Sequence, residues 1–309
     1  MSKNAKNLSG GAAVMNPESV KTKLRKYAIE AKITFQEALV YYGLEGTIRR
    51  ISLTNYADHF VLKGGILLYA VFDRNYGRST TDIDLLAQKI SNRKEEITTV
   101  FRKILSLKLD DGIVFDPDSV TVDTITEFKY YHGLHVSAIG YLNRTRVPVN
   151  IDIGFGDVVS PKAVTMKFPV IFDGEQPEIT AYSLESVISE KLEAIVRNGF
   201  LNSRYKDFYD IYLISKSSPF SFAVLREAIV ETFENRRTTM TSTSSAFGEE
   251  FATYPMHKTR WNAFLKKKKV LVTISLEEVL AEIKRFVFPL LEGTEPDSSV
   301  WNPILERWE

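Results

Sequence analysis

The chain has 309 residues, of which 44% are hydrophobic and 26% are charged, a globular composition long enough for two domains. Its formal net charge of +1 excludes a protein-wide field that attracts nucleic acid, and the lack of cysteine excludes disulfides and thiolate metal sites. No apolar run approaches the roughly eighteen residues of a membrane span, and the N-terminus lacks an apolar signal core, so we expect a soluble cytoplasmic protein with no membrane partner.

The N-terminal half alternates helix and strand signals. Residues 1–15 are rich in Ser, Asn, Gly and Ala and are expected to form a disordered tail. Asn16, Pro17 and Glu18 supply a cap, a first-turn proline and a first-turn acid, which predict a helix start. The alternation is typical of an α/β domain on one mixed sheet, which we place at residues 16–180. The predicted helices are 17–32, 34–52 and 92–107, and the predicted strands are 59–64, 82–88, 119–128, 132–142 and 148–156.

The C-terminal half, residues 181–309, has the pattern of a mostly helical domain. Ser183 is a suitable N-cap and Gly199 a suitable stop for the helix between them. Residues 238–250, TTMTSTSSAFGEE, are predicted to be a polar low-complexity loop. Further helices are predicted at 204–216, 221–236 and 275–292.

Three aspartates interrupt apolar strands. Side chains at positions i and i+2 of a strand point to the same face, so Asp82 and Asp84 of DIDLL share one face while Ile83 takes the other. Asp152 repeats the pattern in NIDIG. Neighbouring carboxylates repel each other unless a cation lies between them, and Mg²⁺ is typically held by carboxylates together with substrate phosphates. The aspartates predict a metal site for in-line phosphoryl displacement, with one ion for an attacking hydroxyl and one for the leaving pyrophosphate.

A glycine pair, Gly64 and Gly65, precedes these aspartates. Glycine lets the backbone approach a phosphate, and ILLYAVF after the pair predicts a helix whose free N–H groups favour anions. An isolated DxD is most often a pair of surface acids, and an isolated Gly-Gly is most often a turn. Strand, Gly-Gly, helix and DxD in this order, followed by a third acid, favour a site for a triphosphate and its metal.

The stretch LKGGILLYAVFDRNYGRSTTDIDLL resembles the Gly-Gly to DxD signature of the DNA polymerase β nucleotidyltransferase superfamily. FVLKGG, RSTTDIDL, NIDIGFGD, SEKLEAIVRNG and RYKDFYDIYLI together resemble the AbiEii/AbiGii-type toxin nucleotidyltransferases, in family order from about residue 60 to 214 and only loosely past 220. The resemblance implies a nucleotidyltransferase-type sheet domain and a bacterial toxin of a toxin–antitoxin or phage-defence (abortive infection) pair. Such enzymes need Mg²⁺ and a nucleoside triphosphate, and some transfer nucleotides to the 3′ end of tRNA.

Two predicted helices carry further candidate residues. Lys191 falls inside an apolar helical arc, which is costly unless the side chain reaches solvent or an anion; the family's motif also has a lysine here, and we assign it to phosphate. The resemblance places a functional acid at Asp207 or Asp210, and Asp207 is the first choice, as a general base or as a group that orients the acceptor. Arg204 and Lys206 lie near a helix start, where the macrodipole disfavours cations, which indicates a ligand or partner charge. The alternatives are a Lys206–Asp210 pair at i, i+4 and a solvated helix face.

Weaker signals come from the loop before DxD and from a lysine run. Arg78 suits bidentate phosphate contact and Thr81 is a hydroxyl beside the metal site, although plain loop polarity explains both equally well. Lys266–Lys269 follow Trp261 and Phe264 and could grip an RNA backbone, although a run of charge is more often a solvated face. The histidines show no spacing that fits a metal site with the carboxylates.

We therefore expect an Mg²⁺-dependent enzyme that transfers a nucleotide from a nucleoside triphosphate to RNA, with the 3′ end of tRNA as the leading acceptor, and so blocks translation. The alternatives are transfer to a protein hydroxyl or a small molecule, and a catalytically idle nucleotide-binding partner protein. Three buried charges count against an idle protein. The resemblance also implies a cognate antitoxin as a partner, whereas the preferred nucleotide does not follow from the sequence.

Overall fold

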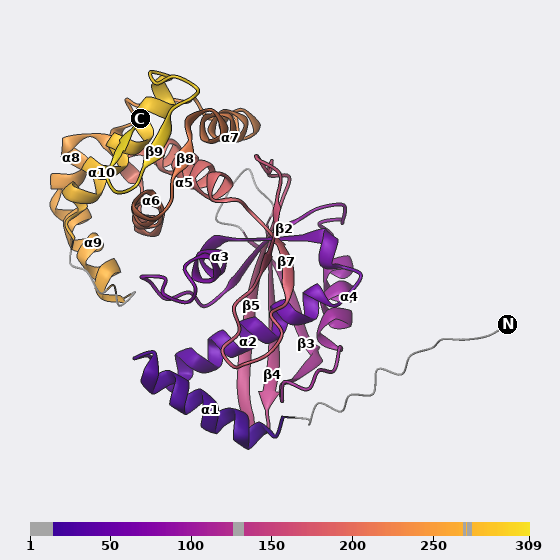
Figure 1. Ribbon diagram of the computed structural model, residues 1–309. Helices are drawn as coiled ribbons and strands as arrows, with labels where there is room; N and C mark the ends of the chain where they lie inside the picture. The colour runs from indigo at the N-terminus through magenta and orange to yellow at the C-terminus, as the bar shows by residue number, and fades with distance from the viewer. Residues whose placement is uncertain (1–14, 126–132, 268–269, 271–273) are drawn as a thin grey trace. The chain divides into compact units, whose positions relative to one another are not determined.

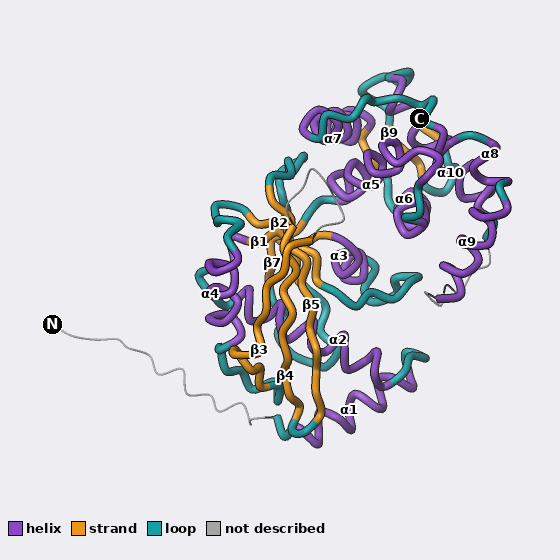
Figure 2. Tube along the Cα trace, turned by 180° about the vertical axis from the view of Figure 1, so that it is seen from behind, coloured by secondary structure: helices purple, strands orange, loops and turns teal. Residues whose placement is uncertain are grey.

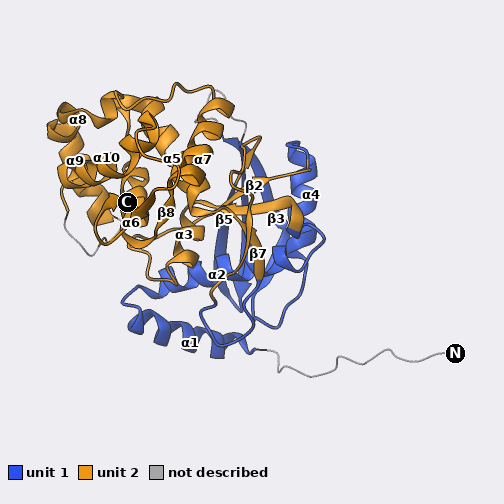
Figure 3. Ribbon diagram, turned by 45° about the horizontal axis from the view of Figure 1, so that its top comes forward, with its two compact units in different colours: residues 1–57, 91–152, 170–177 blue, residues 58–90, 153–169, 178–309 orange. Residues whose placement is uncertain are grey.

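The computed structural model describes residues 15–125, 133–267, 270 and 274–309. They form two compact units, and the chain passes between these units several times (Figure 3). The expected disordered tail lies outside the described residues except for Met15. Unit 1 comprises Met1–Ala57, Ser91–Asp152 and Val170–Pro177, and unit 2 comprises Asp58–Ile90, Ile153–Pro169 and Glu178–Glu309.

Seven strands of the described chain form one mixed sheet in the order β3-β4-β5-β2-β1-β7-β6 (Figure 2). Strands β1 and β2 are antiparallel, with Leu62 opposite Leu85 and Lys63 opposite Asp84, whereas β1 and β7 are parallel. The predicted mixed α/β fold is confirmed. The strands are β1 (Phe60–Lys63), β2 (Ile83–Ala87), β3 (Val114–Ile125), β4 (Gly133–Leu142), β5 (Thr145–Phe155), β6 (Val164–Lys167) and β7 (Glu178–Ala181).

Strand β3 begins at Val114, five residues before the predicted start. Its pairing with β4 shifts register between Asp116 and Thr121, and Pro117 lies inside this irregularity. A proline is tolerated there because β3 is an edge strand of the sheet and a bulge needs no N–H from every residue. The turn signal of the proline therefore hid the first part of the strand.

Unit 1 packs three helices against its long strands (Figure 1). The predicted helix starts are confirmed, since Asn16 caps the first helix and Thr34 forms a capping box at the second. Gly43 allows close packing, because a Cβ atom there would lie only 2.6 Å from Cγ1 of Val147 on β5. The alternation along β5 turns Val147 toward the helices and Asp152 toward the opposite face. The helices are α1 (Pro17–Glu30), α2 (Phe35–Ser52) and α4 (Lys94–Leu105).

Unit 2 joins the β1–α3–β2 segment to the C-terminal helices. As predicted, α5 begins after Ser183, whose hydroxyl accepts from the backbone of Ser186, and ends before Gly199. It packs against α6 and α7, and α10 packs against α6, α7 and α8. None of the described helices is long and apolar enough to cross a membrane. The helices are α3 (Gly64–Val71), α5 (Leu184–Asn198), α6 (Tyr205–Ser217), α7 (Phe222–Asn235), α8 (Glu249–Thr253), α9 (Pro255–Lys267) and α10 (Leu276–Glu292).

Parts of unit 2 differ from the sequence-based expectation. The segment 238–250, expected to be a loop, contains the 3-10 turn Ser245–Phe247 and the first residues of α8. Helices α8 and α9 and a three-stranded sheet have no counterpart in the prediction, because each element is short or weakly patterned. The predicted domain boundary at residues 180 and 181 falls inside β7 and stays a prediction. The small sheet consists of β8 (Phe220–Ser221), β9 (Val300–Asn302) and β10 (Arg307–Trp308).

Candidate active site

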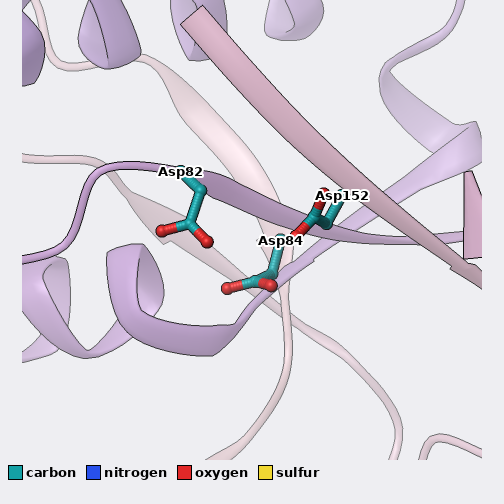
Figure 4. Close-up of side chains that lie close together, drawn as sticks. All are labelled: Asp82, Asp84 and Asp152. Carbon is teal, nitrogen blue, oxygen red and sulfur yellow. The ribbon is translucent and has the colours of Figure 1, made fainter. Parts of the chain in front are cut away.

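Three carboxylates gather where β2 and β5 lie next to each other in the sheet order (Figure 4). Asp82 immediately precedes β2, Asp84 is the second residue of that strand, and Asp152 lies on β5. All three are half-buried, and one carboxylate oxygen from each lies within 4.8 Å of the others. The alternation of the strands explains the arrangement, because the intervening Ile83 is fully buried on the other face. We call Asp82, Asp84 and Asp152 the aspartate triad.

The donor set of the aspartate triad fits Mg²⁺. Carboxylate oxygens are hard ligands of the kind that Mg²⁺ and Mn²⁺ prefer over softer metals. One oxygen of Asp82 is already oriented, since Oδ1 accepts from the backbone N–H of Thr81 at 3.2 Å and from the hydroxyl of Thr80 at 3.3 Å. Three negative groups this close repel one another, and a divalent cation among them removes that cost. The triad has the charge, donor chemistry and spacing of a divalent metal site.

The glycine pair is fitted to Asp84. Gly64 begins α3 with φ at 69°, and a Cβ atom on it would lie 1.8 Å from Oδ2 of Asp84. The backbone N–H of Gly65 donates to that same oxygen at 3.3 Å. The sequence suggested that glycine was needed for a phosphate to approach, whereas in the structure Gly64 makes room for a carboxylate of the triad. Contact of either glycine with a nucleotide stays a prediction.

A second group of charges surrounds Lys191 on α5. Its Nζ lies 2.9 Å from Oδ1 of Asp207 and 2.7 Å from Oδ2 of Asp210, two α6 residues with no exposed surface. Arg204 binds the other oxygen of Asp207 at 2.6 Å, and Arg78 binds Asp210 through Nε and Nη2, each at 2.7 Å. We call these five residues the Lys191 cluster. Three positive side chains against two carboxylates leave it one positive charge in excess.

The acids of the Lys191 cluster are held in their charged form. Burial by itself would raise the pKa of the Asp207 carboxyl, but Lys191 and Arg204 outweigh it and lower that pKa to about 2. In the same way Arg78 and Lys191 overcome burial and hold the pKa of Asp210 well below its usual range. A carboxylate of such low pKa is a weak proton acceptor, so of the two roles expected for Asp207 we favour orientation over general base.

The remaining predicted residues differ in exposure. Arg78 is buried with its two bonded nitrogens on Asp210, while its Nη1 points toward Gly65, 3.3 Å from where a Cβ would stand. Lys206 and Thr81 are exposed. The expected pair of Lys206 with Asp210 does not form, because Asp210 is bound by Arg78, Lys191 and the hydroxyl of Tyr76. Contacts of these residues with a nucleotide remain predictions.

The two groups of charge lie within electrostatic reach of each other. Asp207 is the main cause that raises the pKa of the Arg204 guanidinium, and the charge of Asp84 adds to the effect. Arg204 is also the most exposed of the cluster's cations, with a side chain that is 35% accessible. A positive group beside the aspartate triad is what a bound triphosphate and its metal would require.

The sequence analysis missed a third group of charges, which we call the Lys63 cluster. Lys63, the residue before the glycine pair, binds Asp157 at 3.1 Å and Glu190 at 2.9 Å. Arg236 binds Asp157 and Glu193, each at 2.9 Å, and so links the end of β5 to helices α5 and α7. A lysine inside the apolar run HFVLKGG was a signal for Lys63, but its partners lie more than ninety residues away in the chain.

His135 is the other residue that sequence spacing did not reveal. It lies on β4, and its Nδ1 is 2.6 Å from Oδ1 of Asp152. The sequence analysis found no histidine spaced to join the carboxylates, because spacing along one strand says nothing about the residue opposite on the next. Lys268 and Lys269 of the lysine run lie outside the described residues, and Lys266 and Lys267 are exposed.

Comparison with known proteins agrees with this geometry. The family model of the AbiEii nucleotidyl transferase toxin, type IV toxin–antitoxin system, matches residues 47–282. The crystal structure of a protein from H. pylori described as a candidate nucleotidyltransferase shares 15% sequence identity and a TM-score of 0.50, over 85% of this chain and 100% of that one. The crystal structure of JHP933 from Helicobacter pylori shares 13% identity and a TM-score of 0.48, over 84% of this chain and 94% of that one. No curated protein sequence matches the chain significantly.

Proposed function

The chain belongs to the AbiEii nucleotidyl transferase toxin family of type IV toxin–antitoxin systems, and from this premise we propose that it transfers a nucleotide from a nucleoside triphosphate to the 3′ end of tRNA in an Mg²⁺-dependent reaction. The family predicted from the motifs is confirmed, as is the assignment as a nucleotidyltransferase. Membership implies a nucleoside triphosphate substrate and a cognate antitoxin. The acceptor, the metal and a role in abortive infection are our proposal.

The observation that carries the proposal is the aspartate triad beside the glycine pair. In the reaction a terminal hydroxyl of the acceptor attacks the α-phosphorus, a new P–O ester bond forms, and the bond to pyrophosphate breaks. Asp82, Asp84 and Asp152 would hold Mg²⁺, which supplies charge stabilisation to the transferring phosphoryl group. The excess positive charge of the Lys191 cluster and the N-terminus of α3 favour the triphosphate and the pyrophosphate that leaves.

The proposed acceptor rests on the family resemblance rather than on the charge of the chain. A net charge of +1 gives no general attraction to RNA, so binding must use local positive surface. Exposed cations such as Lys206, Lys266 and Lys267 are candidates. Blocking the 3′ end of tRNA in the cytoplasm would stop translation, which suits a toxin.

The test is a transfer assay with total RNA and each radiolabelled nucleoside triphosphate in turn, with and without Mg²⁺. We expect label in a band of tRNA size that requires Mg²⁺. Asp84→Ala should abolish the label and keep the fold, since it removes a ligand together with one of three repelling charges. Glu190→Gln, which lies outside both the triad and the Lys191 cluster, is the matched carboxylate control and should keep much of the activity.

Label in a protein band or in a small molecule would replace RNA with one of the alternative acceptors. Full activity in the Asp84→Ala protein would refute the mechanism, because the triad would then be unnecessary. Failure of wild-type protein to label any acceptor with any of the nucleotides would contradict the proposal as a whole.

A further inference from the structure

We propose that His135 is a positioning residue for Asp152, which fixes one carboxylate oxygen through its Nδ1–H and leaves the other for the metal. His135 and Asp152 belong to the same compact unit, on strands β4 and β5. Two residues, 143 and 144, join these strands, so they form a hairpin and run antiparallel. The inference rests on the proposed function of the aspartate triad and adds a residue to it.

The first support is the geometry of the contact. Nδ1 of His135 and Oδ1 of Asp152 are 2.6 Å apart, a distance typical of a hydrogen bond with a charged acceptor. An ionised carboxylate has no hydrogen to give, so Nδ1 must be the donor. Asp152 accepts no other hydrogen bond within the described part of the chain, which leaves Oδ2 as its metal ligand atom.

The second support is that the imidazole ring is itself held on both sides. Its Nε2 lies 3.1 Å from the hydroxyl of Ser137, which donates to Oδ1 of Asn150 at 3.1 Å. His135 and Ser137 are two residues apart on β4, and Asn150 and Asp152 are two apart on β5, so all four side chains share one face of the sheet. A ring fixed at both nitrogens cannot turn away from Asp152.

The arrangement also decides against His135 as a metal ligand. Both ring nitrogens are within hydrogen-bond distance of protein partners, and among the described residues the group able to hold a metal contains the three aspartates alone. Asp82 and Asp84 are oriented by hydrogen bonds from their own loop and from Gly65. Asp152 stands in the middle of a strand, where the backbone offers its side chain no such donor, and the neighbouring strand supplies one through His135. Groups that orient a ligand from behind commonly alter metal affinity by about 10- to 100-fold.

The experiment measures metal binding by the full chain without nucleotide, using Mn²⁺ titrated by electron paramagnetic resonance, together with nucleotide transfer in Mg²⁺. His135→Leu removes the donor and keeps the size of the side chain, and it should weaken Mn²⁺ binding by about 10- to 100-fold. His135→Asn places an amide N–H close to the position of Nδ1 and should restore binding to within a few-fold of wild type. Ser137→Ala, on the same face of β4 but not in contact with Asp152, is the matched control and should have a small effect.

A spectroscopic readout follows the hydrogen bond itself. In protein with ¹⁵N-labelled histidine, the Nδ1–H proton of His135 should give a resonance far downfield in the metal-free chain. Asp152→Asn, which has no charged acceptor, should move this resonance upfield. Circular dichroism and thermal unfolding establish that each variant is folded before its metal affinity is compared.

Two results would overturn the assignment. Wild-type Mn²⁺ affinity in folded His135→Leu would show that Asp152 needs no positioning, and equal losses in His135→Asn and His135→Leu would show that the donor is not what matters. Failure of the proposed function is distinguishable, because a chain that transfers no nucleotide can still bind Mn²⁺ through the triad. In that case the order of Mn²⁺ affinities among the His135 variants still decides the present inference.

Discussion

Replacing Gly64 by alanine tests whether the glycine pair exists to admit the Asp84 carboxylate. Gly64 has φ at 69°, a left-handed conformation that costs an alanine about 1–2 kcal/mol. A Cβ atom at Gly64 would also lie 1.8 Å from Oδ2, 2.4 Å from Cγ and 2.6 Å from Cβ of Asp84. Because the last of these atoms is attached to the backbone of β2, rotating the carboxylate cannot relieve the clash. Asp84 must move with its strand, or α3 must shift.

Gly156 provides the matched control for this substitution. It has φ at 82°, so Gly156→Ala carries a similar backbone cost, but no described atom lies within 4 Å of a Cβ atom placed there. We expect both variants to lose about 1–2 kcal/mol of unfolding free energy from the conformational strain, with a further loss in Gly64→Ala. Transfer activity should separate them more clearly, because a displacement of about 1 Å at a reacting centre can cost about 100-fold.

The assay combines urea unfolding with initial rates of nucleotide transfer at saturating Mg²⁺ and nucleotide, at a temperature where both variants are folded. Gly64→Ala should be slower than Gly156→Ala by about 100-fold, which corresponds to about 2.7 kcal/mol in the activation barrier. Equal unfolding free energies together with equal transfer rates would refute the reasoning. In that case Gly64 would be tolerating its backbone angle and nothing more.

Three further predictions follow from the charges. Lys191→Met should lower the unfolding free energy by about 3 kcal/mol, since two charge-assisted hydrogen bonds of about 1.5 kcal/mol each are lost, and should weaken nucleotide binding; denaturant unfolding and calorimetric titration measure the two effects, and unchanged nucleotide affinity would contradict the phosphate role. Burial raises the pKa of Glu45 to about 7, so the folded state holds a proton that the unfolded state has lost, and stability falls as pH rises from about 4.5 to 7. Glu45→Gln should therefore gain about 3 kcal/mol over wild type at pH 8 and nothing at pH 4, and a gain that is the same at both pH values would be inconsistent with this cause. Replacing Lys266–Lys269 by alanine should flatten the log–log salt dependence of RNA binding by about three units, at about 0.7 per phosphate contact, and an unchanged slope in filter binding would assign the run to a solvated face.

Helix α5 organises both clusters that flank the triad. Glu190 and Lys191 are neighbours in sequence, and consecutive side chains on a helix point about 100° apart. Glu190 binds Lys63 beside the glycine pair, whereas Lys191 binds the two acids of α6. One turn of one helix is thus bonded both to the segment that carries Gly64 and to the acids of the Lys191 cluster.

Most of the fold and part of the site were accessible from the sequence because their causes are local. Asn16 and Thr34 cap their helices through hydrogen bonds to residues two or three positions away, and strand alternation puts Asp82 and Asp84 on one face whatever surrounds them. Arg78 shows the limit of this reasoning. Its side chain was expected to face phosphate, yet both bonded nitrogens hold Asp210, which is 132 residues further along the chain.

The sequence by itself determined the order of strand, glycine pair, helix and paired acids, and with it the family and the class of reaction. These depend on backbone periodicity and on residue types within about twenty-five positions of each other. Tertiary structure alone decided that Gly64 makes room for Asp84, that Lys191 sits between two buried acids, and that His135 stands behind Asp152. The register between strands and the packing of α5 on α6 set those contacts. Neither is a property of any short stretch of chain, because a shift of one residue in register would turn His135 to the opposite face of the sheet.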